Sequence, residues 1–222
     1  GQQLEADWVQ AGFTRYATST GLEFRRSPYV LDGGNLVDDG DARAIVTDRF
    51  LADNGLDQTQ AAEILREALG AEQIAILPAD PEDRLGHADG MVAFIAPNAI
   101  AATRCDEPFR TAVLDELRAA FPDVDVVEIE SPAGGPPAAD AAFGSAHGLY
   151  VNAVATDRHL YVPTFGVPED AAALELLRAR SDREIVPVEA RKVAALGGSV
   201  RCLSGQFKGE NARKLIEAAR AR

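Results

Sequence analysis

The hydrophobic and polar positions of the chain repeat one order of elements three times. In each repeat, apolar runs predict two short strands, an amphipathic stretch predicts a helix, and another apolar run predicts a closing strand. The order returns roughly every 58 residues. The predicted ranges are 29–37, 44–47, 57–69 and 73–77, then 91–95, 99–103, 107–121 and 124–129, then 149–155, 159–162, 169–180 and 183–188. Such a period is typical of repeats that bury their apolar faces against one another.

Partial repeats are predicted at both ends of the chain. Residues 4–18 predict a helix with Leu4, Trp8, Val9 and Phe13 on one face. This helix and a short strand at 22–24 resemble the end of an earlier repeat. A strand at 199–203 and a helix at 211–220 resemble an incomplete fourth repeat. The pattern alone leaves open an ordinary α/β alternation without repeats.

Local signals mark element ends and one long loop. Asp57 is expected to cap the helix at 57–69, and Gly70 to end it. Residues 131–148, SPAGGPPAADAAFGSAHG, have no periodicity and predict a loop between the second and third repeats. A loop of this length serves either as a functional lid or as a tolerated surface insertion.

The overall composition narrows the class of protein. A chain of 222 residues with 46% hydrophobic and 26% charged residues can bury one sizeable core or two small ones, and we expect a single domain over 1–222. The net charge of −13 argues against nucleic acid and anionic membranes as partners and is compatible with a small cationic ligand. No apolar run approaches the roughly 20 residues that span a membrane.

Cysteine usage and the first residues bear on the cellular compartment. The two cysteines, Cys105 and Cys202, are too few for a disulfide framework or a structural zinc site. The polar start, GQQLEADWVQ, lacks the layout of a signal peptide. We therefore expect a cytoplasmic protein. Nothing in the sequence implies a metal or an organic cofactor. The sequence does not decide the oligomeric state, and a homo-oligomer is compatible with it.

Candidate catalytic and binding residues lie in three glycine-flanked stretches at or near the starts of the repeats. These are LDGGN at 31–35, GHADG at 86–90 and LGGSVRC at 196–202. If equivalent strand starts converge, Asp32, His87, Asp89 and Cys202 would face one cavity, with glycines allowing close backbone approach. A thiolate nucleophile, an imidazole acid and base, and carboxylates suit attack on a positively charged carbon, for which a guanidinium is the obvious candidate.

Each of these residues also has an ordinary structural interpretation. A lone cysteine is more often a small buried hydrophobe, a loop histidine a surface group, and an aspartate before Gly-Gly a turn residue. Cys105, at a predicted helix start, is the alternative nucleophile, but it lacks a glycine-rich setting and we interpret it as structural. His147 and His159 lack a setting of nearby carboxylates and glycines.

Four runs of the chain resemble the agmatine deiminase and bacterial peptidylarginine deiminase family of guanidino-group-modifying enzymes. They are VLDGGNLV, GHADGMVAFIAP, YVNAVATDRHLYVPTFGVPED and DREIVPVEARKVAALGGSVRCLSGQ, which occur in the family's order and cover most of residues 20–206. The resemblance implies a five-bladed, pentein-type α/β propeller of strand–strand–helix–strand units. Here there would be three full units and partial units at both ends.

The resemblance also implies roles for particular residues. Cys202 would attack the guanidinium carbon, and His87 would protonate the departing ammonia and then activate water. Asp89 would bind the guanidinium, and Asp32, where the family usually has Glu, would hold the substrate or orient His87. Asn35 and Gly198 would shape the substrate-binding pocket, with the other glycines at 33, 34 and 197.

The chain departs from the family pattern at two places. The family's earlier Trp-x-Arg-Asp-x-Gly motif is not found, so we expect a C-terminal piece of a longer protein or a shortened one. Arg201 precedes the cysteine where agmatine deiminases usually have His, and LSGQ follows it. The expected activity is deimination of agmatine or an arginine derivative. An amidinotransferase and a non-catalytic propeller binding protein remain as alternatives.

Overall fold

The computed structural model describes residues 2–132, 137 and 143–221. Most of the predicted loop at 131–148 therefore lies outside the described residues. Contacts divide the chain into two compact units, one formed by Gly1–Pro28 with Gly205–Arg222 and the other by Tyr29–Ser204. A single domain over 1–222 stays a prediction, and each unit is described by itself.

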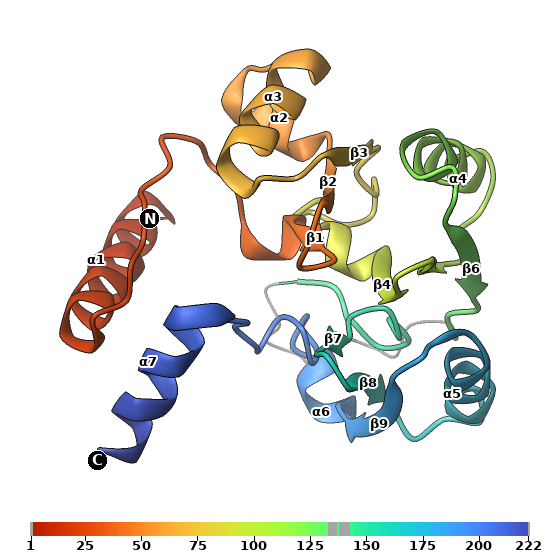
Figure 1. The fold of residues 1–222 in the computed structure, drawn as a ribbon. Helices are drawn as coiled ribbons and strands as arrows, with labels where there is room; N and C mark the ends of the chain where they lie inside the picture. The colour runs from red at the N-terminus through yellow and green to blue at the C-terminus, as the bar shows by residue number, and fades with distance from the viewer. Residues whose placement is uncertain (1, 133–136, 138–142, 222) are drawn as a thin grey trace. The chain divides into compact units, whose positions relative to one another are not determined.

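The described part of the larger unit contains three three-stranded sheets, one for each predicted repeat (Figure 1). In each sheet the first two strands pair antiparallel, and the third pairs parallel to the second after a helical crossover. The sheets comprise β1 Val37–Asp38, β2 Arg43–Thr47 and β3 Gln73–Leu77; β4 Val92–Ala96, β5 Ala99–Thr103 and β6 Asp125–Ile129; β7 Val154–Ala155, β8 His159–Thr164 and β9 Glu184–Glu189.

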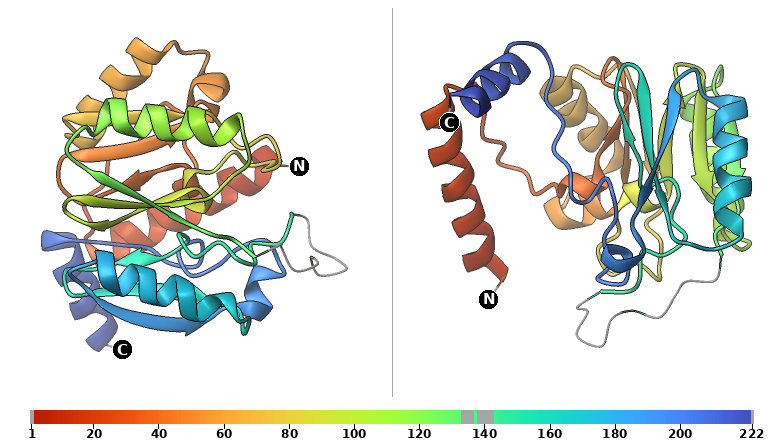
Figure 2. Two further views of the ribbon diagram at one scale, coloured as in Figure 1. Left: turned by 90° about the vertical axis from the view of Figure 1, so that its right-hand side faces the viewer. Right: turned by 90° about the horizontal axis from the view of Figure 1, so that it is seen from below.

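Helices cover the outer sides of these sheets, as two further views show (Figure 2). The crossover helices are α3 Gln58–Leu69, α4 Phe109–Ala120 and α5 Glu169–Arg180, and the short helices are α2 Arg49–Asn54 and α6 Arg191–Ala194. The helix α4 packs against β3 of the first repeat, and α5 contacts β4 of the second. Each repeat thus covers part of its predecessor, as the internal period predicts.

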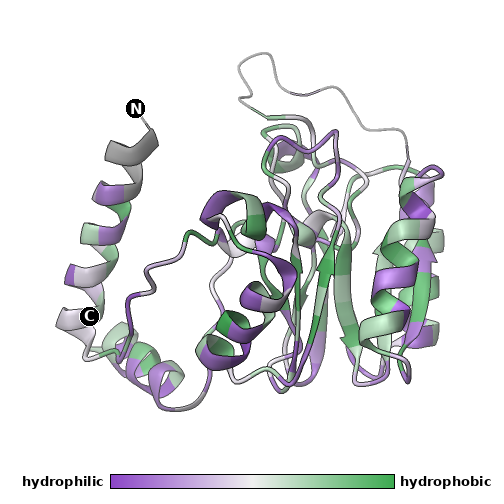
Figure 3. Cartoon of the chain, turned by 90° about the horizontal axis from the view of Figure 1, so that it is seen from above, coloured by the Kyte–Doolittle hydropathy of each residue, from purple (hydrophilic) through white to green (hydrophobic). Residues whose placement is uncertain are grey.

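Neighbouring repeats share their hydrophobic cores (Figure 3). One core joins Ile45 and Leu77 of the first repeat to Phe94 and Phe121 of the second. Another joins the second and third repeats through residues such as Ile95 and Leu160. Burial of apolar surface is the dominant stabilising contribution here, and it fixes how the turns that precede the first strands lie relative to one another.

The predicted helix signals at α3 are confirmed. The carboxylate of Asp57 accepts from the backbone N–H of Gln60, and the Gln60 side chain accepts from the N–H of Asp57. Gly70 ends the helix with φ +72°, a conformation that glycine adopts without a steric penalty.

Several predicted strands were wrong or too long. Residues 29–36 form an irregular segment with a short 3₁₀ helix, η1 (Gly33–Asn35), and only Val37–Asp38 pair as a strand. In the same way, 149–153 form turns before β7. Residues 22–24 are irregular and 200–203 form a turn, so neither is a strand. These apolar side chains gave a strand-like pattern because the turns themselves are partly buried, as at Tyr150 and Val151.

The smaller unit contains two helices, α1 Gln2–Thr20 and α7 Gly209–Arg220. The Asn211 side chain binds both backbone polar groups of Glu23, and Lys214 pairs with the Glu23 carboxylate. The apolar face predicted for α1 is exposed at Trp8 and Val9. No helix among the described residues is long and apolar enough to cross a membrane.

Candidate active site

The structure brings Cys202 and Asp89 together although 113 residues separate them in sequence. The Cys202 Sγ lies 3.8 Å from Oδ2 of Asp89. Cys202 belongs to the C-terminal turn of the larger unit, and Asp89 to the 3₁₀ helix η2 (Ala88–Gly90) that precedes β4. The convergence of repeat starts thus places a thiol beside a buried carboxylate.

Asn152 links these two segments through its side-chain amide. Its Nδ2 lies 3.3 Å from Cys202 Sγ and 3.3 Å from the carbonyl oxygen of Asp89, and it donates to both. Its Oδ1 accepts from the backbone N–H of Arg201 at 3.1 Å and of Cys202 at 3.4 Å. Asn152 therefore fixes the cysteine turn against the aspartate turn and gives the sulfur an N–H donor.

The turn that carries Asn152 is itself anchored to α5. The hydroxyl of buried Tyr150 donates to Oδ1 of Asp170 at 3.0 Å. The same carboxylate accepts from the backbone N–H groups of residues 165–167. Because a buried hydroxyl needs a partner, this network holds the turn in one position.

His87 and Asp32 form the other half of the site. The Nε2 of His87 lies 3.5 Å from Oδ2 of Asp32, and the Asp32 side chain is 69% exposed while that of His87 is 19% exposed. The backbone N–H of His87 donates to Oδ2 of Asp83 at 2.8 Å. An exposed carboxylate beside a half-buried imidazole suits a group that exchanges protons with solvent.

Burial and nearby charges set the electrostatics of the site. Burial raises the pKa of Asp89, and the positive charges of His87 and Arg201 and hydrogen bonds from Asn152 and Cys202 oppose the rise. The residue Cys202 is exposed, but its sulfur is packed against neighbours. Desolvation and the charge of Asp89 raise its pKa, while the Ser199 backbone N–H and Asn152 oppose the rise. In the protein without substrate, the thiol is therefore held mainly protonated near neutral pH.

Gly198 lies beside Cys202, whereas Asn35 lies behind the turn that carries His87. A Cβ at Gly198 would lie 3.3 Å from Cβ of Cys202, so this glycine lies directly against the cysteine. Asn35 is buried, and its Oδ1 accepts from the backbone N–H of Thr47 at 2.8 Å. The Thr47 hydroxyl in turn donates to the carbonyl oxygen of Gly86, next to His87. Asn35 thus supports the turn that carries His87, and its predicted contact with substrate stays a prediction.

Cys105 lies in a different setting from Cys202. Its thiol donates to the Thr103 carbonyl oxygen at 3.4 Å. Burial and the charges of Asp80, Asp106 and Glu128 raise its pKa. This setting agrees with the structural interpretation of Cys105. No group of three or more potential metal ligands occurs in the ranges that the structure describes.

The sequence interpretation missed the part that Asn152 takes in the site. The signal that points to it is Asn-x-Val at equivalent repeat positions, Asn35–Val37 and Asn152–Val154, each just before a first strand.

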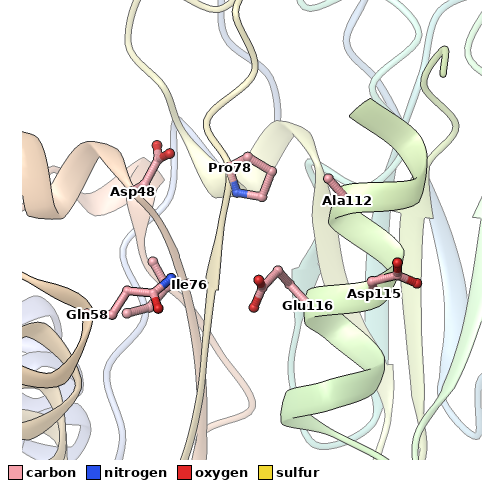
Figure 4. A pocket seen from close by; sticks show the side chains of 7 residues that line it. All are labelled: Asp48, Gln58, Ile76, Pro78, Ala112, Asp115 and Glu116. Atoms are coloured by element: carbon pink, nitrogen blue, oxygen red, sulfur yellow. The ribbon is translucent and has the colours of Figure 1, made fainter. Parts of the chain in front are cut away.

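A hollow of about 390 Å³ lies elsewhere, between the first two repeats (Figure 4). None of the residues described above as the site lines it. Its lining includes three carboxylates, and Asp48 uses its own to accept from the Ala79 backbone N–H. The lining residues are Asp48, Gln58, Ile76, Pro78, Ala112, Asp115 and Glu116.

The family model described as Porphyromonas-type peptidyl-arginine deiminase matches residues 2–207. The chain belongs to this family. The match covers the whole of the larger unit, part of the smaller one and every residue of the site.

Individual relatives agree with the family. The chain is 28% identical over 216 residues to the agmatine deiminase of Pseudomonas fluorescens, covering 83% of this chain and 58% of that protein. The matches to two further curated relatives cover 60% and 58% of those proteins. The chain therefore spans about three-fifths of the length of the curated relatives it matches. The solved structure of the C. jejuni agmatine deiminase superimposes with a TM-score of 0.70 at 24% identity, over 84% of this chain and 58% of that one. This likeness shows that the chain has the same kind of α/β fold.

Proposed function

We propose that this protein is a deiminase that hydrolyses a guanidinium group to a ureido group and ammonia. The observation that carries the proposal is the contact of Cys202 with Asp89, which come from distant segments. The charge of His87 acts on the same Asp89 carboxylate, and His87 pairs with Asp32 from a third segment. Together they supply a nucleophile, a carboxylate for the cation and a proton carrier, the groups that substitution at a guanidinium carbon requires. The family match over residues 2–207 supports the same reaction class.

The proposed reaction proceeds through a covalent intermediate. The thiol of Cys202 loses its proton to solvent as the cation binds, and its sulfur bonds to the guanidinium carbon while Asp89 holds the cation. His87 gives a proton to the departing nitrogen, so that the C–N bond breaks and ammonia leaves. His87 then takes a proton from water, whose oxygen bonds to the same carbon. The C–S bond breaks, and the departing sulfur takes the remaining proton of that oxygen. The products are a ureido compound, ammonia and the free thiol. Binding of a cation would also lower the thiol pKa that burial and Asp89 raise.

The substrate class rests on the guanidinium rather than on its tail. The family description names a peptidyl-arginine deiminase, and curated relatives are named agmatine deiminases. A solved relative is a cysteine-to-serine variant of the C. jejuni agmatine deiminase with substrate bound. These names share one reacting group. We therefore propose a guanidinium substrate and leave the tail to experiment.

We also infer that the three repeats are three blades of a five-bladed propeller. The shared cores between consecutive repeats and the chain's span of about three-fifths of its relatives support this arrangement. A cytoplasmic location and the absence of nucleic acid partners stay predictions.

Incubation with agmatine and, separately, with a blocked peptidyl arginine tests the proposed reaction. We expect equal amounts of ureido product and ammonia from at least one of the two, and no product with Cys202→Ala. The matched control, Cys105→Ala, should retain activity. Amidino transfer to an added amine without ammonia would contradict the proposal, as would turnover by Cys202→Ala.

A further inference from the structure

Arg201 joins three segments of the site. Its Nη2 donates to the carbonyl oxygen of Leu36 at 2.6 Å, in the turn between η1 and β1. Its Nε lies 3.9 Å from Oδ2 of Asp89, in η2. Its backbone N–H donates to Asn152. The side chain is 18% exposed, so the guanidinium forms part of the protein interior around the site.

The Asp89 carboxylate needs a cation that does not titrate. Its side chain is 4% exposed, and burial without a counter-charge favours the neutral acid. The titratable or charged groups that act on it are His87, Arg201 and Cys202. In the proposed reaction His87 gives up its proton, and Cys202 carries no positive charge in any state. The guanidinium of arginine stays protonated throughout the working pH range.

We propose that Arg201 is a positioning residue that keeps Asp89 ionised and in place, so that Asp89 binds a guanidinium ligand. This inference rests on the proposed function and deepens it. The hydrogen bond to Leu36 holds the Arg201 guanidinium beside the carboxylate rather than in the place of the ligand's own guanidinium. One fixed cation then supports the carboxylate while a second, the ligand, binds to it.

Removal of the positive charge of Arg201 should raise the pH at which guanidinium binding is lost. Without Arg201 the pKa of Asp89 rises further, because one of the two opposing cations is lost. A guanidinium binds the ionised carboxylate, so binding is lost as pH falls through that pKa. In Arg201→Gln this loss therefore occurs at a higher pH.

Binding of methylguanidine, which has no substrate tail, tests the inference without turnover. The affinity is measured by NMR titration from pH 5 to 9 on Cys202→Ala and on Cys202→Ala with Arg201→Gln. In the variant with Arg201→Gln, we expect the pH at which binding is lost on acidification, the acid limb, to be higher by about one pH unit. Below that pH, binding should be about tenfold weaker than with Arg201 intact. Arg201→Lys, which restores a cation, should return the limb most of the way.

Arg43 offers a matched control in the same unit. Like Arg201, it binds one carboxylate and one backbone carbonyl, those of Asp39 and Pro97, with a side chain that is 14% exposed. Arg43→Gln should lower thermal stability without moving the pH limb. An unchanged limb in Arg201→Gln, or the same shift in Arg43→Gln, overturns the inference alone. Failure of Cys202→Ala with Arg201 intact to bind methylguanidine overturns the proposed function, and this inference with it.

Discussion

Gly34 lies directly against the imidazole of His87, so closely that a Cβ at position 34 would be 2.3 Å from Nδ1. The two residues are 53 positions apart and belong to turns of consecutive repeats. Because no Cβ can approach a ring nitrogen to this distance, glycine at 34 is a condition for the observed position of His87.

Gly34→Ala should therefore displace His87 and lower activity on the order of a hundredfold, since a shift of about 1 Å in a catalytic group has that effect. The rate of ureido product formation measures it. Gly33→Ala is the matched control, because a Cβ there would have nothing within 4 Å. Similar losses in both variants would show that the contact with His87 does not matter.

Asn152→Asp should raise the pKa of Cys202. The substitution replaces the Nδ2 donor, 3.3 Å from the sulfur, by an oxygen and adds a negative charge. The pH dependence of iodoacetamide alkylation, followed by peptide mass spectrometry, should shift upward by about one unit or more. Cys105 in the same sample serves as the internal control, and its curve should not move.

Asp89→Asn should have the opposite effect on the same thiol. The charge of Asp89 raises the pKa of Cys202, so its removal lowers that pKa and moves the alkylation curve to lower pH. Although Cys202 should be alkylated faster at a given pH in Asp89→Asn, this variant should be inactive, because the carboxylate proposed to bind the guanidinium is gone. A curve that moves upward, or normal turnover, would contradict this account of Asp89.

Asp57→Ala should lower the free energy of unfolding by about 1 kcal/mol through loss of the capping box of α3. For a unit of this size that corresponds to a drop in Tm of about 2–4 °C. Glu63→Ala, on the exposed side of the same helix, is the control and should change Tm little. Since α3 carries none of the site residues, product formation at 25 °C should be unaffected by either variant.

The sequence predicted those parts of the fold whose pattern follows from burial in regular elements. The helix α5 and the strands β3 and β5 have the predicted bounds. Continuous apolar runs mark the two strands, and acidic residues in the first turn with arginines in the last turn mark the helix. The segments before the first strands were mistaken for strands. Tyr150 is buried by its contact with Asp170 and Phe165 rather than by a sheet, and hydrophobic pattern alone does not separate these cases.

The candidate site was predictable as a group of residues but not as a geometry. Glycine pairs beside Asp32, His87 and Cys202 indicated where the backbone turns toward a shared point. The amide of Asn152 and the guanidinium of Arg201 lie among apolar or ordinary loop residues. Their contribution depends on which atoms they reach across 50 or more positions. The recurring Asn-x-Val marks the position of Asn152 but does not give those contacts.

The most direct test of the central claim is the mass of the protein after treatment with 2-chloroacetamidine, which combines an amidinium cation with a carbon that reacts with thiols. We expect a single adduct on Cys202, formed more slowly in excess methylguanidine, and no adduct on Cys105. Equal labelling of both cysteines, or labelling of Cys202 that methylguanidine does not slow, would contradict a guanidinium site around Cys202.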